Sequence, residues 1–213
     1  CVFVLGGAKI SDAFMMMENV LSGGLADRVL CGGLVGNILL AAEGEAIGRG
    51  SMDFIYKSNY GGYIETAGKI LEKYTDRIVV PADLGYVENG GRKECRMGAV
   101  PEGITAVDIG TETASLYKDI IMSAKTVFVN GPMGVFENPE SELGTKTVWD
   151  ALGATEAFTV VGGGDSVTAT AKYQKTDKIS YICTGGGALI RFLTGEELPA
   201  VRALRFAAKK FGG

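Results

Sequence analysis

The sequence predicts an α/β protein with a doubly wound, mostly parallel sheet, helices on both faces and a small β-hairpin flap. Apolar runs of strand type alternate with helical patterns along almost the whole chain, which is the pattern of a parallel sheet with crossover helices. Five of these runs break off into glycine and then restart as a helix: FVLGGAK, RVLCGGLVGN, TVFVNGPMGVFE, TVVGGGDS and YICTGGGA. The carboxyl ends of parallel strands share one edge, where ligands bind in such sheets. We therefore expect all five junctions at one crevice.

Seven apolar runs are the expected strands. Val2–Leu5 is apolar throughout, as in a strand that is covered on both faces. We expect the strands at 2–5, 28–31, 77–80, 104–109, 126–129, 158–161 and 179–183. Helical spacing of apolar residues predicts the helices at 11–22, 34–42, 58–74, 112–123, 143–152, from 165 and 187–193.

Two further segments have their own patterns. The stretch DLGYVENGGRKECRMG contains two alternating segments around Asn89, Gly90 and Gly91, which predicts an antiparallel hairpin that forms a peripheral flap. We expect the polar stretch EGEAIGRGSMD to be a loop. An amphipathic helix is expected after Pro199, with its apolar face on this sheet or on a neighbour outside the chain.

Composition limits the class of protein. With 213 residues, 46% of them hydrophobic, the chain can bury a real core, and we expect a single domain over 1–213. A net charge of −4 argues against a nucleic-acid surface, which needs clustered Lys and Arg. No apolar run approaches the roughly 20 residues that span a bilayer. We expect a soluble, cytoplasmic protein without membrane or nucleic-acid partners.

The cysteines and the absent histidine exclude several chemistries. The four cysteines form no CxxC pair and there is no histidine, so the usual zinc sites and the Ser-His-Asp triad are excluded. Cys31 and Cys183 end apolar runs, so we expect buried free thiols. The first residue is Cys1 rather than Met and lies at the start of a strand, so we expect the chain to begin within a longer protein.

The glycine junctions are candidate anion sites. Glycines let backbone N–H groups face a ligand, and the following helix adds its unpaired amides and the positive end of its dipole. Neither GxxxxGK[ST] nor GxGxxG occurs in them. The chain instead has GGAK, NGPMGVFE, GGGDS and TGGGA, each directly after its strand.

Together these four motifs resemble the C-terminal nucleotide-binding domain of phosphoglycerate kinase. The resemblance runs from FVLGGAKISD to CTGGGALIRFLTGEELPAV, and it is specific because of the order and spacing of the motifs. It implies a Rossmann-like domain that binds ADP or ATP with Mg²⁺. The implied nucleotide-binding residues are Gly7, Ala8, Lys9, Gly32, Gly33, Asn130, Pro132, Gly134, Val135, Glu137, Gly162, Gly163, Gly164, Asp165 and Ser166.

The resemblance also assigns roles. Lys9, Asp165, Gly164, Gly185 and Gly186 are the implied catalytic residues, and Asp165 is the implied Mg²⁺ ligand. By the same resemblance, Glu137 accepts hydrogen bonds from the ribose hydroxyls, and Gly32 and Gly33 form the floor of the adenine pocket. Family members often have a second lysine four positions after Lys9, where this chain has Ala13.

Simpler interpretations stay open for each motif. Lys9 can be a solvated lysine at a helix start, Glu137 an exposed loop carboxylate, and Asp165 an acid that complements a helix dipole. The glycine pairs can be plain strand-to-helix turns.

The implied reaction is reversible phosphoryl transfer between 1,3-bisphosphoglycerate and ADP, giving 3-phosphoglycerate and ATP in glycolysis and gluconeogenesis. Such transfer needs positioning and charge neutralisation rather than a covalent intermediate, which suits a chain without histidine. The family binds its acid substrate on an arginine-rich N-terminal domain, so we expect 1,3-bisphosphoglycerate and 3-phosphoglycerate to bind outside this chain. We expect the chain alone to bind nucleotide and to be inactive.

Three other functions remain possible at this stage. The first is a nucleotide-binding regulatory module without catalysis. The second is a dinucleotide-dependent dehydrogenase, which the lack of GxGxxG disfavours. A scaffold without ligand is the third, and it explains the fewest residues.

Overall fold

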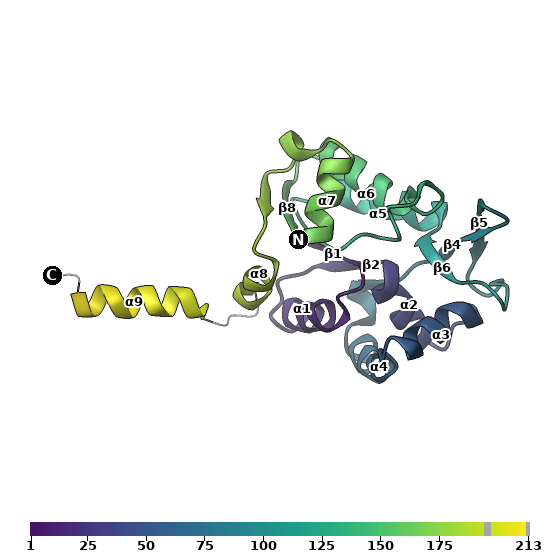
Figure 1. The fold of residues 1–213 in the computed structure, drawn as a ribbon, viewed down its shortest axis with the longest axis horizontal. Coiled ribbons are helices and arrows are strands. Elements are labelled where there is room, and N and C mark those ends of the chain that lie inside the picture. The colour runs from purple at the N-terminus through teal and green to yellow at the C-terminus, as the bar shows by residue number, and fades with distance from the viewer. Residues whose placement is uncertain (194–196, 212–213) are drawn as a thin grey trace.

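A computed structural model describes residues 1–193 and 197–211 (Figure 1). Its central sheet has six strands, all parallel, in the order β3-β2-β1-β7-β8-β9. The expected doubly wound sheet is confirmed, and each of the five glycine junctions follows one of its strands. The strands are β1 Val2–Leu5, β2 Arg28–Cys31, β3 Ile78–Val79, β7 Thr126–Asn130, β8 Phe158–Gly162 and β9 Tyr181–Cys183.

Helices cover both faces of the sheet, and a hydrophobic cluster lies on each face. Phe3 and Leu5 of β1 pack with α1, α2 and α4, whereas Val2 and Val4 pack with α5, α6 and α7. This alternation is the two-residue period of a strand that is buried on both faces. The helices are α1 Ile10–Ser22, α2 Gly33–Ala42, α3 Arg49–Lys57, α4 Gly62–Tyr74, α5 Thr111–Ser123, α6 Leu143–Ala154, α7 Gly164–Lys172, α8 Gly186–Leu193 and α9 Pro199–Phe211, with the 3₁₀ turns η1 Thr75–Arg77, η2 Pro139–Ser141 and η3 Thr176–Lys178.

The predicted hairpin is confirmed, and it belongs to a second, three-stranded sheet. Strands β4 (Asp83–Glu88) and β5 (Gly91–Arg96) pair antiparallel around Asn89 and Gly90. The strand expected at 104–109 is β6 (Ala106–Ile109), and it pairs antiparallel with β4. Figure 1 shows this sheet at the opposite end of the molecule from α8 and α9. The first four residues of β4 are buried, so this sheet packs against the rest of the chain.

Three sequence-based expectations need correction. Helix α3 begins within the stretch expected to be a loop, and its buried residues are only Ser51 and Ile55. The helix expected at 58–74 begins at Gly62, after the left-handed residue Asn59. Cys31 is buried as expected, but Cys183 is only half-buried because β9 is an edge strand.

The C-terminal helix stands apart from the sheets. Figure 1 shows α9 extending away from the body, and none of its residues is buried. Residues 194–196, which the expected C-terminal motif includes, lie outside the described residues. None of the described helices is long and apolar enough to cross a membrane.

Candidate functional site

Three of the glycine junctions are hydrogen-bonded to one another at the carboxyl edge of the sheet. The loop after β1 bonds to the loop after β7, since the Gly6 N–H donates to the Asn130 carbonyl and the Gly7 N–H to that of Pro132, at 3.0 and 2.8 Å. The loop after β2 joins them, because the Gly33 N–H donates to the Met133 carbonyl at 2.7 Å. Backbone from three separate strands is thus fixed into one wall.

A cavity of about 400 Å³ opens beside this wall, which is large enough for a small-molecule ligand. Loops from both sheets and helices α2, α3 and α7 contribute to its lining. Eight of the residues predicted from the sequence line it: Gly7, Ala8, Gly33, Pro132, Gly134, Val135, Glu137 and Asp165. The carboxylate-bearing residues Glu137 and Asp165 therefore border the same space.

A smaller hollow adjoins the cavity and is lined mostly by backbone. The two share Gly7, Ala8 and Asp165, so they are neighbours. The hollow lies between the loops after β1, β7 and β8, and five further predicted residues line it: Lys9, Asn130, Gly163, Gly164 and Ser166. Ser166 is fully buried, and its hydroxyl oxygen accepts the Gly131 N–H at 2.7 Å.

Other predicted glycines lie outside both spaces. A Cβ on Gly32 would lie 2.6 Å from the Met133 sulfur, so Gly32 is where the loop after β7 packs closely on β2. Gly162, the last residue of β8, lines neither space. Gly185 follows the edge strand β9 and also lines neither, while Gly186 begins α8.

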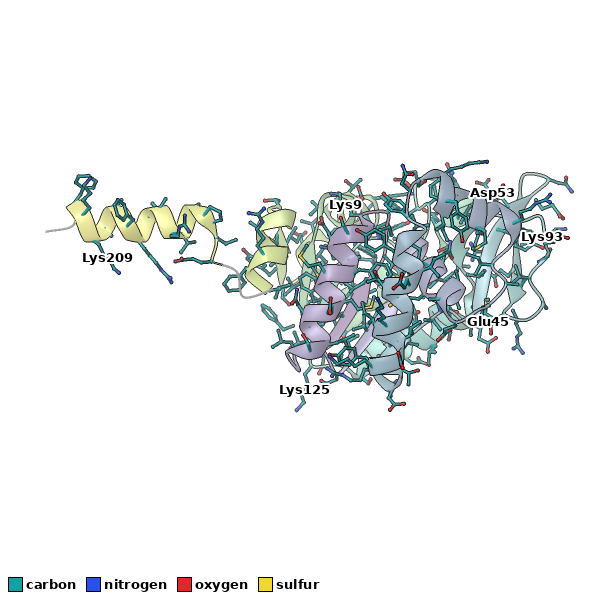
Figure 2. The ribbon with its side chains drawn as sticks, turned by 90° about the horizontal axis from the view of Figure 1, so that it is seen from below. Lys9, Glu45, Asp53, Lys93, Lys125 and Lys209 are labelled. Carbon is teal, nitrogen blue, oxygen red and sulfur yellow. The ribbon has the colours of Figure 1, made fainter. Side chains whose placement is uncertain are left out.

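The hollow is suited to an anion. Lys9 is the N-terminal flanking residue of α1, and its side chain is exposed. Figure 2 shows Lys9, which follows β1, at the top of the body and Lys125, which precedes β7, at the bottom. Across the hollow, α7 begins at Gly164, and no side chain of its flanking residue caps the first turn. The first amides of α7 thus have no acceptor within the helix.

The single carboxylate at this point fits Mg²⁺ only in combination with a ligand phosphate. Asp165 is exposed in the first turn of α7 and lines both spaces. The described residues contain no group of three or more His, Cys, Asp or Glu side chains that could hold a metal. Mg²⁺ usually keeps several waters and takes one or two protein carboxylates together with substrate phosphates.

The loop that carries Glu137 is held from two sides. The Val135 N–H donates to the carbonyl of Val107 in β6, at 2.8 Å. From the other side, the Lys172 ammonium donates to the Phe136 carbonyl and pairs with Glu142 at 2.7 Å. Lys172 is the last residue of α7, so the helix that carries Asp165 in its first turn also positions the neighbour of Glu137.

One residue of the cavity lining, Asp108, forms an ion pair with Arg92. Asp108 of β6 lines the cavity, and its side chain is fully buried. It accepts hydrogen bonds from the N–H groups of Ile109 and Gly144 and from the Arg92 guanidinium, each at 2.9 Å. Burial raises the pKa of Asp108 to about 6, although these three donors act in the opposite direction. Arg92 also donates to the carbonyls of Ile109 and Glu140.

Sequence reasoning missed the part of the cavity formed by α3, by β6 and by the residues of α2 that follow Gly33. Asn37 is the one strongly polar residue of an apolar helix, and Asp108 interrupts the apolar run AVDI. A polar residue in an otherwise buried element is the signal that could have identified both. Ser51 and Phe54 could not be found in this way, because the helix that carries them was not predicted. The unpredicted lining residues are Leu34, Asn37, Ser51, Phe54, Thr105, Ala106, Val107, Asp108, Ile109 and Phe136.

Comparison with known proteins identifies the family. The family model described as phosphoglycerate kinase matches residues 1–196. The chain belongs to the phosphoglycerate kinase family. A relative from Methanothermobacter thermautotrophicus, named phosphoglycerate kinase, is 46% identical over 204 residues, which are 96% of this chain and 49% of the relative. The phosphoglycerate kinase of Pyrococcus abyssi is 42% identical over 99% of this chain and 52% of its own length.

Solved phosphoglycerate kinases have the same fold. The crystal structure from Pyrococcus horikoshii OT3 matches with a TM-score of 0.91 at 41% identity, over 99% of this chain and 53% of that one. The structure from Coxiella burnetii matches with a TM-score of 0.85 at 30% identity, with the same two coverages. The chain thus spans about half the length of the phosphoglycerate kinases it matches.

Proposed function

We propose that this chain forms the nucleotide-binding domain of a phosphoglycerate kinase and binds ADP or ATP with Mg²⁺. The observation that carries the proposal is the cavity of about 400 Å³ that adjoins a backbone-lined hollow, with Glu137 and Asp165 on its border. A nucleoside has the size of the cavity, and polyphosphate has the charge that free helix amides and Lys9 attract. We propose the whole of 1–213 as one domain that works in the cytoplasm.

The proposed roles follow from where the side chains lie. Glu137 accepts hydrogen bonds from the ribose hydroxyls at the cavity border, while Lys9 and the first amides of α7 bind phosphate oxygens in the hollow. Asp165 would hold Mg²⁺, which would neutralise phosphate charge when bound. The loop after β9, with Gly185 and Gly186, supplies further amides near the transferred group.

The proposed reaction is phosphoryl transfer between 1,3-bisphosphoglycerate and ADP. The bond between phosphorus and the carboxylate oxygen breaks, and a bond to a terminal oxygen of ADP forms, which gives 3-phosphoglycerate and ATP. No proton needs to move, so lysine and backbone donors suffice to stabilise the charge of the transferred group. We propose that the acid substrate binds on a domain outside this chain and that the chain alone does not turn over.

Calorimetry on this chain tests the binding proposal. We expect the chain to bind ADP more tightly with Mg²⁺ than without it, and we expect Asp165→Asn to remove this gain while it leaves metal-free binding unchanged. Glu137→Gln should weaken ADP but not 2′,3′-dideoxy-ADP. A matched control is Glu140→Gln, a nearby, partly buried glutamate that lines neither space. If ADP does not bind, or if both carboxylate variants bind like the unmodified chain, the assignment is wrong.

A coupled assay with 1,3-bisphosphoglycerate and ADP tests the catalytic part. We expect no ATP formation above the uncatalysed rate from this chain alone. Turnover at the rate of a complete kinase would contradict the proposed division of the substrates between two domains.

A further inference from the structure

Asn37 is an anomaly in the core of the chain. It lies on α2 and is only 8% exposed, yet its side-chain carboxamide forms no hydrogen bond with any other described residue. A buried carboxamide without a partner destabilises a fold. The other buried polar side chains of the described residues all have partners: Ser51, Asp83, Asp108, Thr113, Ser141, Thr145, Thr159, Ser166 and Thr170.

The Asn37 carboxamide faces the cavity. Within the described part of the chain, every side-chain nitrogen or oxygen that is sealed from open space has a hydrogen-bond partner. The Asn37 amide has none, so its polar atoms contact open space. Asn37 lines the large cavity, which is therefore the space that its donor and acceptor face.

The wall that contains Asn37 lies away from the phosphate end. The small hollow shares Gly7, Ala8 and Asp165 with the cavity but includes no residue of α2 or α3. A ligand with its phosphates in the hollow thus places its other end toward these two helices. In the lining of the same cavity, the buried Ser51 hydroxyl accepts the Ala106 N–H at 2.8 Å and keeps its own hydrogen to donate. Phe54 adds an aromatic side chain to this wall.

We propose that Asn37 recognises the amino edge of an adenine base and selects it over other purines. This inference rests on the proposed function, that the cavity binds a nucleotide. A carboxamide presents one donor and one acceptor side by side. Adenine presents its exocyclic amine beside a ring nitrogen acceptor, which matches the amide in two hydrogen bonds. The missing partner of Asn37 is then the base itself.

Calorimetry with paired ligands tests the proposal. Purine riboside 5′-diphosphate lacks the exocyclic amine of ADP and is otherwise identical. We expect the unmodified chain to bind ADP about tenfold more tightly than this analogue or GDP, in line with the discrimination that one bidentate contact gives. Asn37→Leu keeps a similar volume and should bind ADP and the analogue equally, at the weaker affinity. Asn19→Leu is the matched control on α1, and it should keep the preference for ADP.

A melting experiment separates recognition from a structural role. Asn37→Leu removes an unpartnered amide from the core, so the ligand-free variant should melt at the same temperature as the unmodified chain or higher. If the preference for ADP survives in Asn37→Leu, or if GDP binds the unmodified chain as tightly as ADP, the proposal is overturned. A lower melting temperature with equal losses for all ligands would assign Asn37 a structural role instead. If the unmodified chain binds none of these diphosphates, the proposed function fails first.

Discussion

Replacing Arg92 with methionine should destabilise the protein in a pH-dependent way. The Arg92 guanidinium lies 2.9 Å from the Asp108 carboxylate, whose side chain is fully buried, whereas that of Arg92 is 17% exposed. At an effective dielectric constant of about 20, their attraction is roughly 6 kcal/mol before desolvation. Removing one partner of a buried pair costs about 3–5 kcal/mol. Because Arg92 is partly exposed, we expect the lower end, about 3 kcal/mol, at pH 8.

The loss of stability caused by Arg92→Met should be smaller at acid pH. Burial raises the pKa of Asp108 to about 6 from its ordinary value of 3.8. A raised carboxyl pKa contributes stability that is fully present below the unfolded pKa and is lost as the pH rises through the folded pKa. Without Arg92 the folded pKa rises further. At pH 5 Asp108 is then protonated, so only the bonds from Arg92 to the carbonyls of Ile109 and Glu140 are lost, about 1.5 kcal/mol.

Urea unfolding at pH 5 and pH 8 measures this difference. The destabilisation by Arg92→Met should be about 1.5 kcal/mol larger at pH 8 than at pH 5, which corresponds to a rise of about one unit in the Asp108 pKa. In an Asp108→Asn background, Arg92→Met should cost about 1.5 kcal/mol at both pH values, because the charge is gone. Arg96→Met is the control, since its pair with Glu112 is exposed on both sides and is worth about 0.5 kcal/mol or less. An equal cost of Arg92→Met at both pH values, or in both backgrounds, would refute the reasoning.

Two further changes test the supports of the site. Lys172→Met removes the donor to the Phe136 carbonyl beside Glu137. We expect Mg-ADP to bind about fivefold more weakly in calorimetry, which is equivalent to about 1 kcal/mol. Lys175→Met, which removes an ion pair with Asp150, is the control and should leave the affinity unchanged. Unchanged affinity in Lys172→Met would show that Glu137 does not depend on this bond. Tyr117→Phe removes a fully buried hydroxyl that lies 2.6 Å from the Cys31 carbonyl and 2.8 Å from the Val79 carbonyl. We expect the free energy of unfolding to fall by about 1–3 kcal/mol, measured by urea unfolding. A variant as stable as the unmodified chain would contradict this.

The sequence predicted the parts of the fold whose cause is local. The run Val2–Leu5 is apolar at every position, and the structure buries all four residues between two helical layers. Glycine after the strand and apolar spacing in the next helix likewise act within a few residues, so α1, β2 and α5 were predicted to within one residue. These signals also give the edge of the sheet at which the junctions meet.

The sequence could not predict the elements that depend on distant contacts. Helix α3 follows Gly48, which packs against Ile104 from the segment before β6, so its position depends on a segment more than 50 residues away. The pairing of Asp108 with Arg92 joins two strands that are separated by β4 in the second sheet. No local pattern indicates which of the chain's arginines reaches a given carboxylate. The wall of the cavity formed by α3 and β6 was missed for this reason.

The second sheet explains how a cavity can form at the edge of the first. Parallel strands bring the glycine loops together, but loops alone form only one wall. Strand β6 adds to the lining and is fixed to the loop after β7 and to α6, since the Val107 carbonyl accepts the Val135 N–H and Asp108 accepts the Gly144 N–H. Arg92 joins the hairpin to this strand and to the Glu140 carbonyl near η2. The hairpin therefore braces β6, the strand to which the loop that carries Glu137 is hydrogen-bonded.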